Sequence, residues 1–308
     1  MTDPDLEKRA IDVIRGLAMD APHAANSGHQ GTAMALAPLA HVLWTRIMSY
    51  DAADPDWPDR DRFVLSAGHA SILQYSMLHL TGFGLTLDDI KDFRQWESRT
   101  PGHPEHGHTR GVEVTTGPLG QGFANAVGMA IAERWLAARF GEDLFDHHTF
   151  VIASDGDLQE GVSHEAASLA GHQKLGKLVV VYDDNHVSID GPTELSLSDD
   201  AATRFRGYGW DVDEIGEVAE DLDALEAALR RAKSVTDAPT LIVLRSHIGF
   251  PSPSHTDDPE AHGLAFDADD ITEAKAVMGI PDEPFWVPDD VVGYYRTAGE
   301  QGRTAREE

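Results

Sequence analysis

The apolar positions of the chain follow two spacings, one typical of helices and one typical of buried strands. Residues 5–20 carry apolar side chains at intervals of three and four positions, which predicts an amphipathic helix. Residues 31–48 are more uniformly apolar and predict a second helix, in which Pro38 would introduce a kink. The chain therefore opens with two helical segments.

Further along, short apolar runs alternate with helical patterns. The runs predict strands at 63–65, 149–153, 178–182 and 240–244. The helical patterns cover about 70–80, the segment from the glycine run at 117–122 to about 139, 163–174 and 219–234. This alternation predicts a doubly wound α/β fold, with a mainly parallel sheet and helices on both of its faces.

We expect this domain to cover residues 1–270. The tail, residues 271–308, contains Pro281, Pro284 and Pro288 and then charged residues, which indicates a docked arm or linker. Ligands of doubly wound sheets lie beyond the carboxyl ends of the strands. The glycine-rich and acidic segments of this sequence fall at those ends.

The charge of the chain narrows its possible partners. Its 308 residues include 53 acidic and 24 basic ones, which gives a formal net charge of −29. This excess argues against nucleic acid and against an anionic membrane surface, and it indicates a well-solvated protein. The sequence has no apolar window of about eighteen residues and begins MTDPDLEKRA, so we expect neither a membrane span nor a signal peptide.

Cysteine is absent from the sequence. Its absence excludes disulfides, zinc–thiolate sites and thiol nucleophiles. It also suits a reducing compartment, and we expect a cytoplasmic protein.

An acid and an amide follow two neighbouring predicted strands. Asp155 comes after the strand at 149–153, and Asn185 comes after the strand at 178–182. If these strands are parallel neighbours, both side chains lie at one edge of the sheet. Their oxygens suit magnesium or calcium, and so small a ligand set suggests that phosphates complete the shell. Both residue types also favour turns and caps, so a purely structural role stays open.

Two further features indicate a polar, anion-binding cleft. The glycine run at 117–122 opens a helix and offers backbone N–H groups and a positive dipole end to an anion. Four histidines, His29, His69, His103 and His262, lie in glycine-containing loops and not on an apolar face.

With these segments, the chain resembles the N-terminal, diphosphate-binding domain of transketolase. The matching segments are NSGHQG (26–31), RDRFVLSAGHA (60–70), TPGHPE (100–105), TTGPLGQGFANAVGMAIAE (115–133), SDGDLQEGVSHEAASLAG (154–171) and LVVVYDDNHVSIDG (178–191). They occur in the order of the family and span nearly the whole chain. The resemblance implies the thiamine diphosphate-binding fold.

The resemblance also implies a cofactor and a metal. Asp155, Asn185 and the backbone carbonyl of Val187 would bind Mg²⁺ or Ca²⁺, and this ion would hold the diphosphate of thiamine diphosphate. The cofactor-contacting positions would be His69, Gly117, Pro118, Leu119, Gly156, Asp157, Asn185, Ile189 and Ile248. Ile189 and Ile248 could equally be core residues.

Catalytic and interface positions follow from the same resemblance. The residues around the reacting atoms would be His29, His69, His103 and His262. Arg94 could meet the acceptor sugar or lie on the surface. Glu160 and Glu165 match acidic residues of a subunit interface, although a solvated helix surface would explain them too. His103, His106 and His108 are close in sequence, but we do not expect a zinc site because no further ligand is near.

The sequence departs from the family pattern at three places. Gln30 replaces the usual proline of SGHPG, which loosens a rigid turn beside His29 and adds an amide. Ser154 replaces the first glycine of GDG. The segment SPSHTDDPEAHG (252–263) is more acidic than usual and adds His255.

The resemblance implies a divided enzyme. Transketolases continue through a pyrimidine-binding and a C-terminal domain, which would come here from a separate subunit in a heterodimer or heterotetramer. The expected reaction transfers a two-carbon ketol unit from a ketose, usually phosphorylated, to an aldose. Two alternatives stay open: a non-catalytic or truncated thiamine diphosphate-binding module, and the E1 α-subunit of a 2-oxo acid decarboxylating enzyme.

Overall fold

A five-stranded parallel sheet forms the centre of the computed structural model, which describes residues 3–189 and 191–307. Residues 1–2, 190 and 308, at the ends and within the predicted domain and arm, lie outside the described part. The strand order is β1 (Arg62–Leu65), β2 (Thr149–Ser154), β3 (Leu178–Asp184), β7 (Thr240–Arg245) and β6 (Asp211–Gly216). Every neighbouring pair in the sheet is parallel. The predicted fold class is confirmed.

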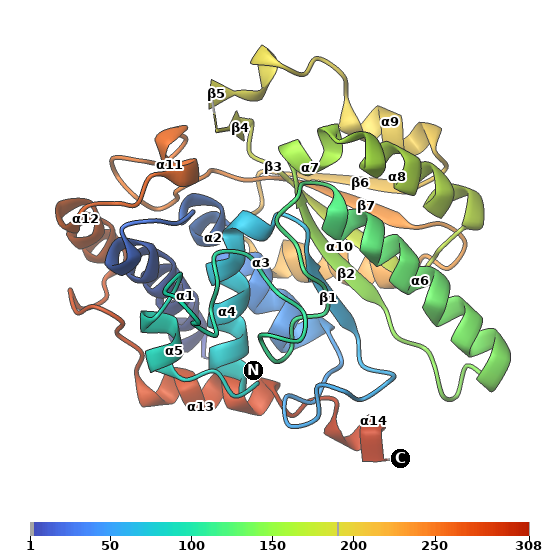
Figure 1. Cartoon of the computed structure of the whole chain (residues 1–308), viewed down its shortest axis with the longest axis horizontal. Coiled ribbons are helices and arrows are strands. Elements are labelled where there is room, and N and C mark those ends of the chain that lie inside the picture. Colours follow the sequence, from blue (N-terminus) through green and yellow to red (C-terminus); the bar gives the residue numbers. More distant parts are fainter. Residues whose placement is uncertain (1–2, 190, 308) are drawn as a thin grey trace.

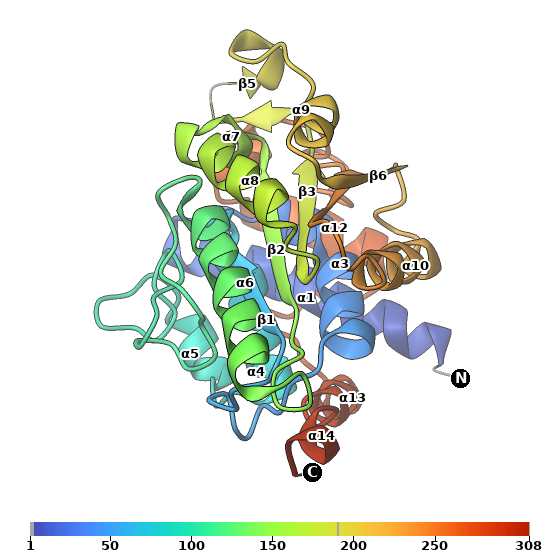
Figure 2. The same cartoon turned by 90° about the vertical axis from the view of Figure 1, so that its right-hand side faces the viewer.

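Helices cover both faces of this sheet, as Figures 1 and 2 show. One face carries α6 (Gln121–Phe140), α8 (Gly161–Gln173) and α9 (Ala201–Gly207). The other face carries α1 (Pro4–Ala25), α3 (Ala37–Val42), α4 (Ser71–Thr81) and α10 (Leu222–Lys233). Along β2, Val151 and Ala153 face the first layer, whereas Phe150 and Ile152 face the second. Burial on both faces explains why β2, β3 and β7 (Thr240–Arg245) each contain a run of consecutive apolar residues.

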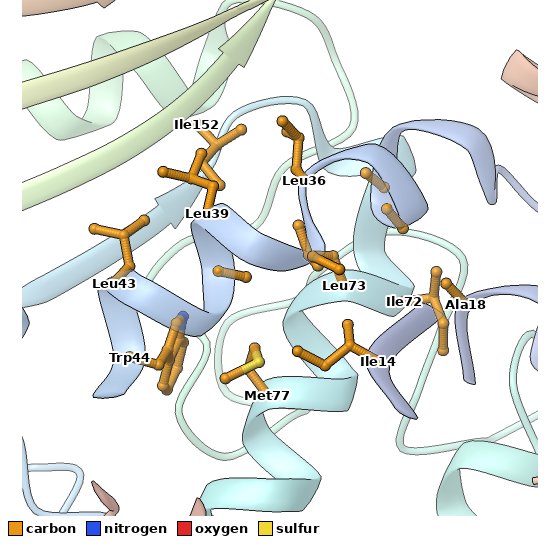
Figure 3. Close-up of a cluster of buried hydrophobic side chains, with 14 of the residues drawn as sticks. Ile14, Ala18, Leu36, Leu39, Leu43, Trp44, Ile72, Leu73, Met77 and Ile152 are labelled. Carbon is orange, nitrogen blue, oxygen red and sulfur yellow. The ribbon is translucent and has the colours of Figure 1, made fainter. Parts of the chain in front are cut away.

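The layer that contains α1, α3, α4 and α10 has a continuous apolar core built from distant parts of the sequence. Figure 3 shows Ile14 of α1, Leu39 of α3 and Met77 of α4 packed together, with Ile152 of β2 at the edge of the cluster. Each of these side chains is buried. This packing fixes the helical layer against the sheet.

The predicted helix at 31–48 is broken where the sequence predicted only a kink. It forms α2 (Gly31–Ala35), α3 and a π-helical turn at Leu43–Ile47. Pro38 lies in the first turn of α3, where its missing N–H costs nothing, so the chain starts a new helix there.

The remaining elements are short and mostly connect the sheet to its helices. They are the 3₁₀ turns Gly68–Ala70 and Thr193–Leu195, α5 (Leu87–Lys91), α7 (Asp155–Gln159), α11 (Glu260–Gly263) and the hairpin β4 (Val187–Ser188) with β5 (Gly191–Pro192). Among the described helices, none is long and apolar enough to cross a membrane.

The segment predicted as an arm contains helices that pack on the domain. It includes most of α12 (Ala268–Met278), and then α13 (Asp289–Ala298) and α14 (Arg303–Glu307). Tyr295 of α13 is fully buried, and its hydroxyl lies 2.8 Å from Nδ1 of His41. Lys275 of α12 is also buried, and its ammonium donates to both carboxylate oxygens of Asp20 in α1, at 2.8 and 3.1 Å. Polar contacts as well as apolar ones therefore attach this segment.

Asp20→Ala is expected to lower the free energy of unfolding by about 3–5 kcal/mol, because it leaves the Lys275 ammonium buried without its counter-charge. Urea denaturation measures the change. Asp290→Ala is the matched control, since it removes a more exposed ion pair with Arg9 and should cost less than about 1 kcal/mol. Equal losses in the two variants would contradict a structural role for the buried pair.

Candidate functional site

A cavity of about 590 Å³ opens at the carboxyl edge of the sheet, where β2 and β3 end. Many predicted residues line it: His29, His69, His103, Gly117, Leu119, Gly156, Glu160, Asn185, Val187, Ile189 and His262. Thr32, Ser154, Gln159 and Ser188 complete the lining. A larger hollow of about 740 Å³ lies elsewhere, but its Arg46 is already paired with Glu7 and Glu226. The smaller cavity is therefore the better candidate site.

Asp155 and Asn185 come to the same edge because β2 and β3 are parallel and in register. Ser154 pairs with Asp183, so Asp155 follows one residue after that pair and Asn185 two residues after it. Asp155 Oδ1 accepts a hydrogen bond of 2.5 Å from the Tyr182 hydroxyl. Its Oδ2 is buried and has no hydrogen-bond partner among the described residues.

Burial raises the pKa of Asp155 to about 7, and the nearby carboxylates Asp183 and Asp184 add to this rise. A buried carboxylate oxygen without a donor costs free energy that a bound cation would offset. Asp155 therefore fits a metal ligand better than a turn residue. Ser154 and Asp157 form the capping box of α7, so the cap does not depend on the Asp155 side chain.

Asn185 is held by hydrogen bonds that leave room for one further ligand. Its Nδ2 donates to Asp183 Oδ2 at 2.7 Å, and its Oδ1 accepts from the Val187 N–H at 2.9 Å. Because an amide oxygen has two lone pairs, Oδ1 can bind a cation as well. His186, with φ at 63°, turns the chain between Asn185 and Val187. The residues present thus fit a small oxygen site for a divalent ion.

Asp157 does not line the cavity, although the sequence predicted that it contacts the cofactor. It is fully buried, and its Oδ1 accepts from the Gly120 N–H at 2.8 Å and the Ser66 hydroxyl at 2.9 Å. Its Oδ2 accepts from the Ser154 N–H at 3.1 Å. Burial raises the pKa of Asp157, and these hydrogen bonds oppose the rise. Its carboxylate holds the glycine loop against the ends of β1 and β2.

Three histidine rings meet at one side of the cavity. The ring centroids of His69 and His262 are 4.7 Å apart, and His29 lies 5.2 Å from His69 and 5.5 Å from His262. Burial lowers the pKa of His29 to about 4, with His262 and Arg94 contributing, and burial also lowers the pKa of His69 and His262. Neutral imidazoles each offer one donor and one acceptor. His69 Nε2 and His262 Nδ1 are buried and have no partner in the described chain, which is unusual unless a ligand binds there.

His103 and Arg94 lie at the rim of the same group. Gly117 has φ at +135°, so its backbone conformation favours glycine, and a Cβ there would lie 3.2 Å from the His103 ring. Arg94 Nη2 lies 3.1 Å from His29 Nδ1, and its Nη1 donates to the Ser27 hydroxyl. Arg94 therefore reaches the site through His29.

The other histidines of the 103–108 segment point to separate backbone carbonyls. His106 Nδ1 lies 3.0 Å from the Val112 oxygen, and His108 Nε2 lies 2.7 Å from the Ser98 oxygen. Within residues 3–189 and 191–307, no group of three His, Asp or Glu side chains is arranged to hold a metal. A zinc site at this segment is not supported.

Three other predicted positions, Asp155, Pro118 and Ile248, are not part of the cavity lining. Ile248 is fully buried against Gly31. Ile189 lines the cavity but is 76% exposed. Glu160, directly before α8, and Glu165, within it, are also exposed. Thr32, Gln159 and Ser188 line the cavity but were not predicted from the sequence. Each lies close in sequence to a predicted residue, and this was the only sign that they belong to the site.

Comparisons with known proteins identify the family. Residues 6–308 match the family described as transketolase, thiamine diphosphate binding domain. The transketolase of Nostoc sp. is 52% identical over 301 residues, which is 96% of this chain and 45% of that protein. The transketolase of Mycobacterium leprae is 49% identical and aligns with 98% of this chain and 44% of its own length. The chain thus spans about half the length of the curated relatives it matches.

Solved structures agree with the sequence comparison. Pichia stipitis transketolase in complex with sedoheptulose-7-phosphate has a TM-score of 0.95 and 45% identity, and the match covers 98% of this chain and 45% of that one. Leishmania mexicana transketolase also has a TM-score of 0.95 and 45% identity, over 100% of this chain and 46% of its own. The resemblance predicted from the sequence is confirmed, and the chain belongs to the family of transketolase thiamine diphosphate-binding domains.

Proposed function

We propose that this chain is the diphosphate-binding subunit of a divided transketolase, which transfers a two-carbon ketol unit from a ketose or ketose phosphate to an aldose. A second polypeptide would supply the pyrimidine-binding and C-terminal domains, in a heterodimer or heterotetramer. The observation that carries this proposal is the family match over residues 6–308, combined with a cavity whose lining includes His69, Gly117, Leu119, Gly156, Asn185 and Val187 from the predicted diphosphate side. We also propose a cytoplasmic location, which the absence of cysteine supports.

The metal and diphosphate would be held by the edge of the sheet. Asp155, Asn185 and the Val187 carbonyl would bind Mg²⁺ or Ca²⁺, and Asp155 Oδ2, which has no hydrogen-bond partner within residues 3–189 and 191–307, supports this assignment. His69 and the backbone of the Gly117–Leu119 loop would contact the phosphates, while Gly156 leaves space beside them. When bound, thiamine diphosphate supplies the carbon nucleophile for the carbonyl of the ketose.

The histidines would handle protons and hold the substrate. His29, His103 and His262 line the cavity, and burial lowers the pKa of each. In their neutral form these imidazoles donate to a carbonyl oxygen or accept from a hydroxyl. Arg94, beside His29, would contact the acceptor sugar. The exposed Leu119 and Ile189 would lie against the cofactor rings.

The partner would bind the outer face of α6 and α8, which Figure 2 shows side by side on the surface. Large apolar side chains are exposed on these helices: Ile131, Trp135, Val162 and Leu169. Ile131 and Trp135 are four positions apart, so they share one face of α6. Exposed apolar side chains that lie next to one another are typical of protein interfaces. Glu160 and Glu165 border this surface, which supports their predicted interface role.

Ketol transfer is expected only when the chain is mixed with the polypeptide that carries the missing domains, thiamine diphosphate and Mg²⁺. Each polypeptide alone should be inactive, since half of the site would be absent. Product formation from a ketose phosphate and an aldose measures this. Activity of this chain alone would contradict the division of labour. An inactive mixture that still binds the cofactor would favour a non-catalytic module, and decarboxylation of a 2-oxo acid would favour the E1 α-subunit.

Asp155→Ala should weaken thiamine diphosphate binding to the complex by about a hundred-fold or more at fixed Mg²⁺, because a ligand of the cation is lost. Isothermal titration calorimetry measures the affinity. Asp184→Ala serves as a control, since it removes a neighbouring carboxylate that lies 3.3 Å from His186 Nε2. If the two variants bind equally well, the metal-ligand assignment is wrong.

Trp135→Glu should weaken association with the partner polypeptide by at least about 30-fold, because it puts a charge into an apolar interface. Val277→Glu is the matched control, since Val277 is similarly exposed but lies on α12, on a different part of the molecule. Analytical ultracentrifugation measures both. Equal weakening, or none, would contradict the proposed binding face.

A further inference from the structure

Gln30 connects two segments that carry histidines of the cavity. It directly follows His29, it is only 1% exposed, and its Nε2 donates a hydrogen bond to the backbone carbonyl of Leu264. Leu264 comes two residues after His262, at the end of α11. One side chain therefore joins the His29 loop to the backbone next to His262.

The neighbouring Gly31 holds the other end of the same segment, residues 249–264. Its carbonyl accepts a hydrogen bond of 3.1 Å from the N–H of Gly249. A Cβ on Gly31 would lie 2.5 Å from the Ala261 oxygen, so the two backbones are in close contact. Residues 30 and 31 thus contact both ends of a segment that otherwise contains only turns and the four-residue α11.

This attachment matters for His262 because no hydrogen bond holds its Nδ1, which is buried without a partner in the described part of the chain. The ring only packs against those of His69 and His29. Its position therefore depends also on the backbone of residues 260–264. That backbone lies against the His29 ring, since a Cβ on Gly263 would be 3.6 Å from its Nε2.

The amide of Gln30 does more than fill space. Its Oε1 is buried and has no partner among the described residues. A buried acceptor of this kind costs stability, and an apolar side chain of equal size would avoid that cost. The proline usual at this position in the family would leave Leu264 without this donor. Among the described residues, the hydrogen bond to Leu264 is the one hydrogen bond that the amide of Gln30 forms.

We propose that Gln30 is a positioning residue: its amide holds segment 249–264 against the His29 loop and so fixes the His262 ring in the cavity. Its effect on catalysis rests on the proposed function, whereas the attachment itself does not. His23 Nδ1 lies 2.8 Å from the Phe266 oxygen and anchors the chain just beyond, so loss of the amide should act locally and leave α12 folded.

Hydrogen exchange on the isolated chain tests the attachment. In Gln30→Met, which keeps the length but removes the donor, the amides of Ala261, His262 and Leu264 should exchange about ten-fold faster. Gln301→Met is the matched control, because Gln301 also donates to backbone carbonyls, those of Trp44 and Met48, but lies near α14 at the other end of the molecule (Figure 1). Unchanged exchange at 261–264 in Gln30→Met overturns the proposal. If Gln30→Met does not fold, Gln30→Asn, whose amide is one carbon too short, replaces it.

Kinetics of the assembled enzyme test the positioning role. Gln30→Met should lower kcat about ten-fold or more, with a smaller change in KM, because the His262 ring is misplaced while other binding groups remain. Gln301→Met should leave both unchanged. Faster exchange with unaltered kcat would overturn the positioning role. If the wild-type mixture is inactive, the proposed function fails, and the exchange experiment still decides whether Gln30 holds the segment.

Discussion

The candidate site depends on one buried carboxylate, that of Asp157. It accepts hydrogen bonds from Ser66 after β1, from Gly120 in the glycine loop and from Ser154 at the end of β2. Ser66 in turn accepts from the Phe123 N–H in the first turn of α6. Because an ionised carboxylate only accepts, one aspartate can collect donors from several chain segments at once. The ends of two strands and the start of a helix are thereby fixed relative to each other before any ligand binds.

Most of the fold could be predicted because the central strands are buried on both faces. Every residue of β2 is buried, so its apolar run was evident in the sequence. Strand β6 was missed because it is an edge strand that reads DVDEIG and is only partly buried. The helices of the tail were hidden by Pro281, Pro284 and Pro288, which lie between α12 and α13 and not within either helix.

The site was predictable where it follows from topology and motifs. Parallel strands end at one edge, so Asp155 and Asn185 had to come close once β2 and β3 were neighbours. The role of Asp157 could not be predicted, since it depends on which backbone N–H groups the fold brings near its carboxylate. Gln30 is a similar case, because its partner Leu264 is distant in sequence and the two meet only through the packing of loops.

The three clustered imidazoles have a consequence for the behaviour of the chain in acid. In the folded chain burial lowers the pKa of His29, His69 and His262, whereas in the unfolded chain each regains its ordinary value near 6.5. As the pH falls through that value, the histidines of the unfolded chain become protonated while those of the folded chain stay neutral. The free energy of unfolding therefore declines. The cavity that these three histidines line thus makes the protein less stable in acid. An anion bound beside the rings would favour their charged form and so offset this loss of stability.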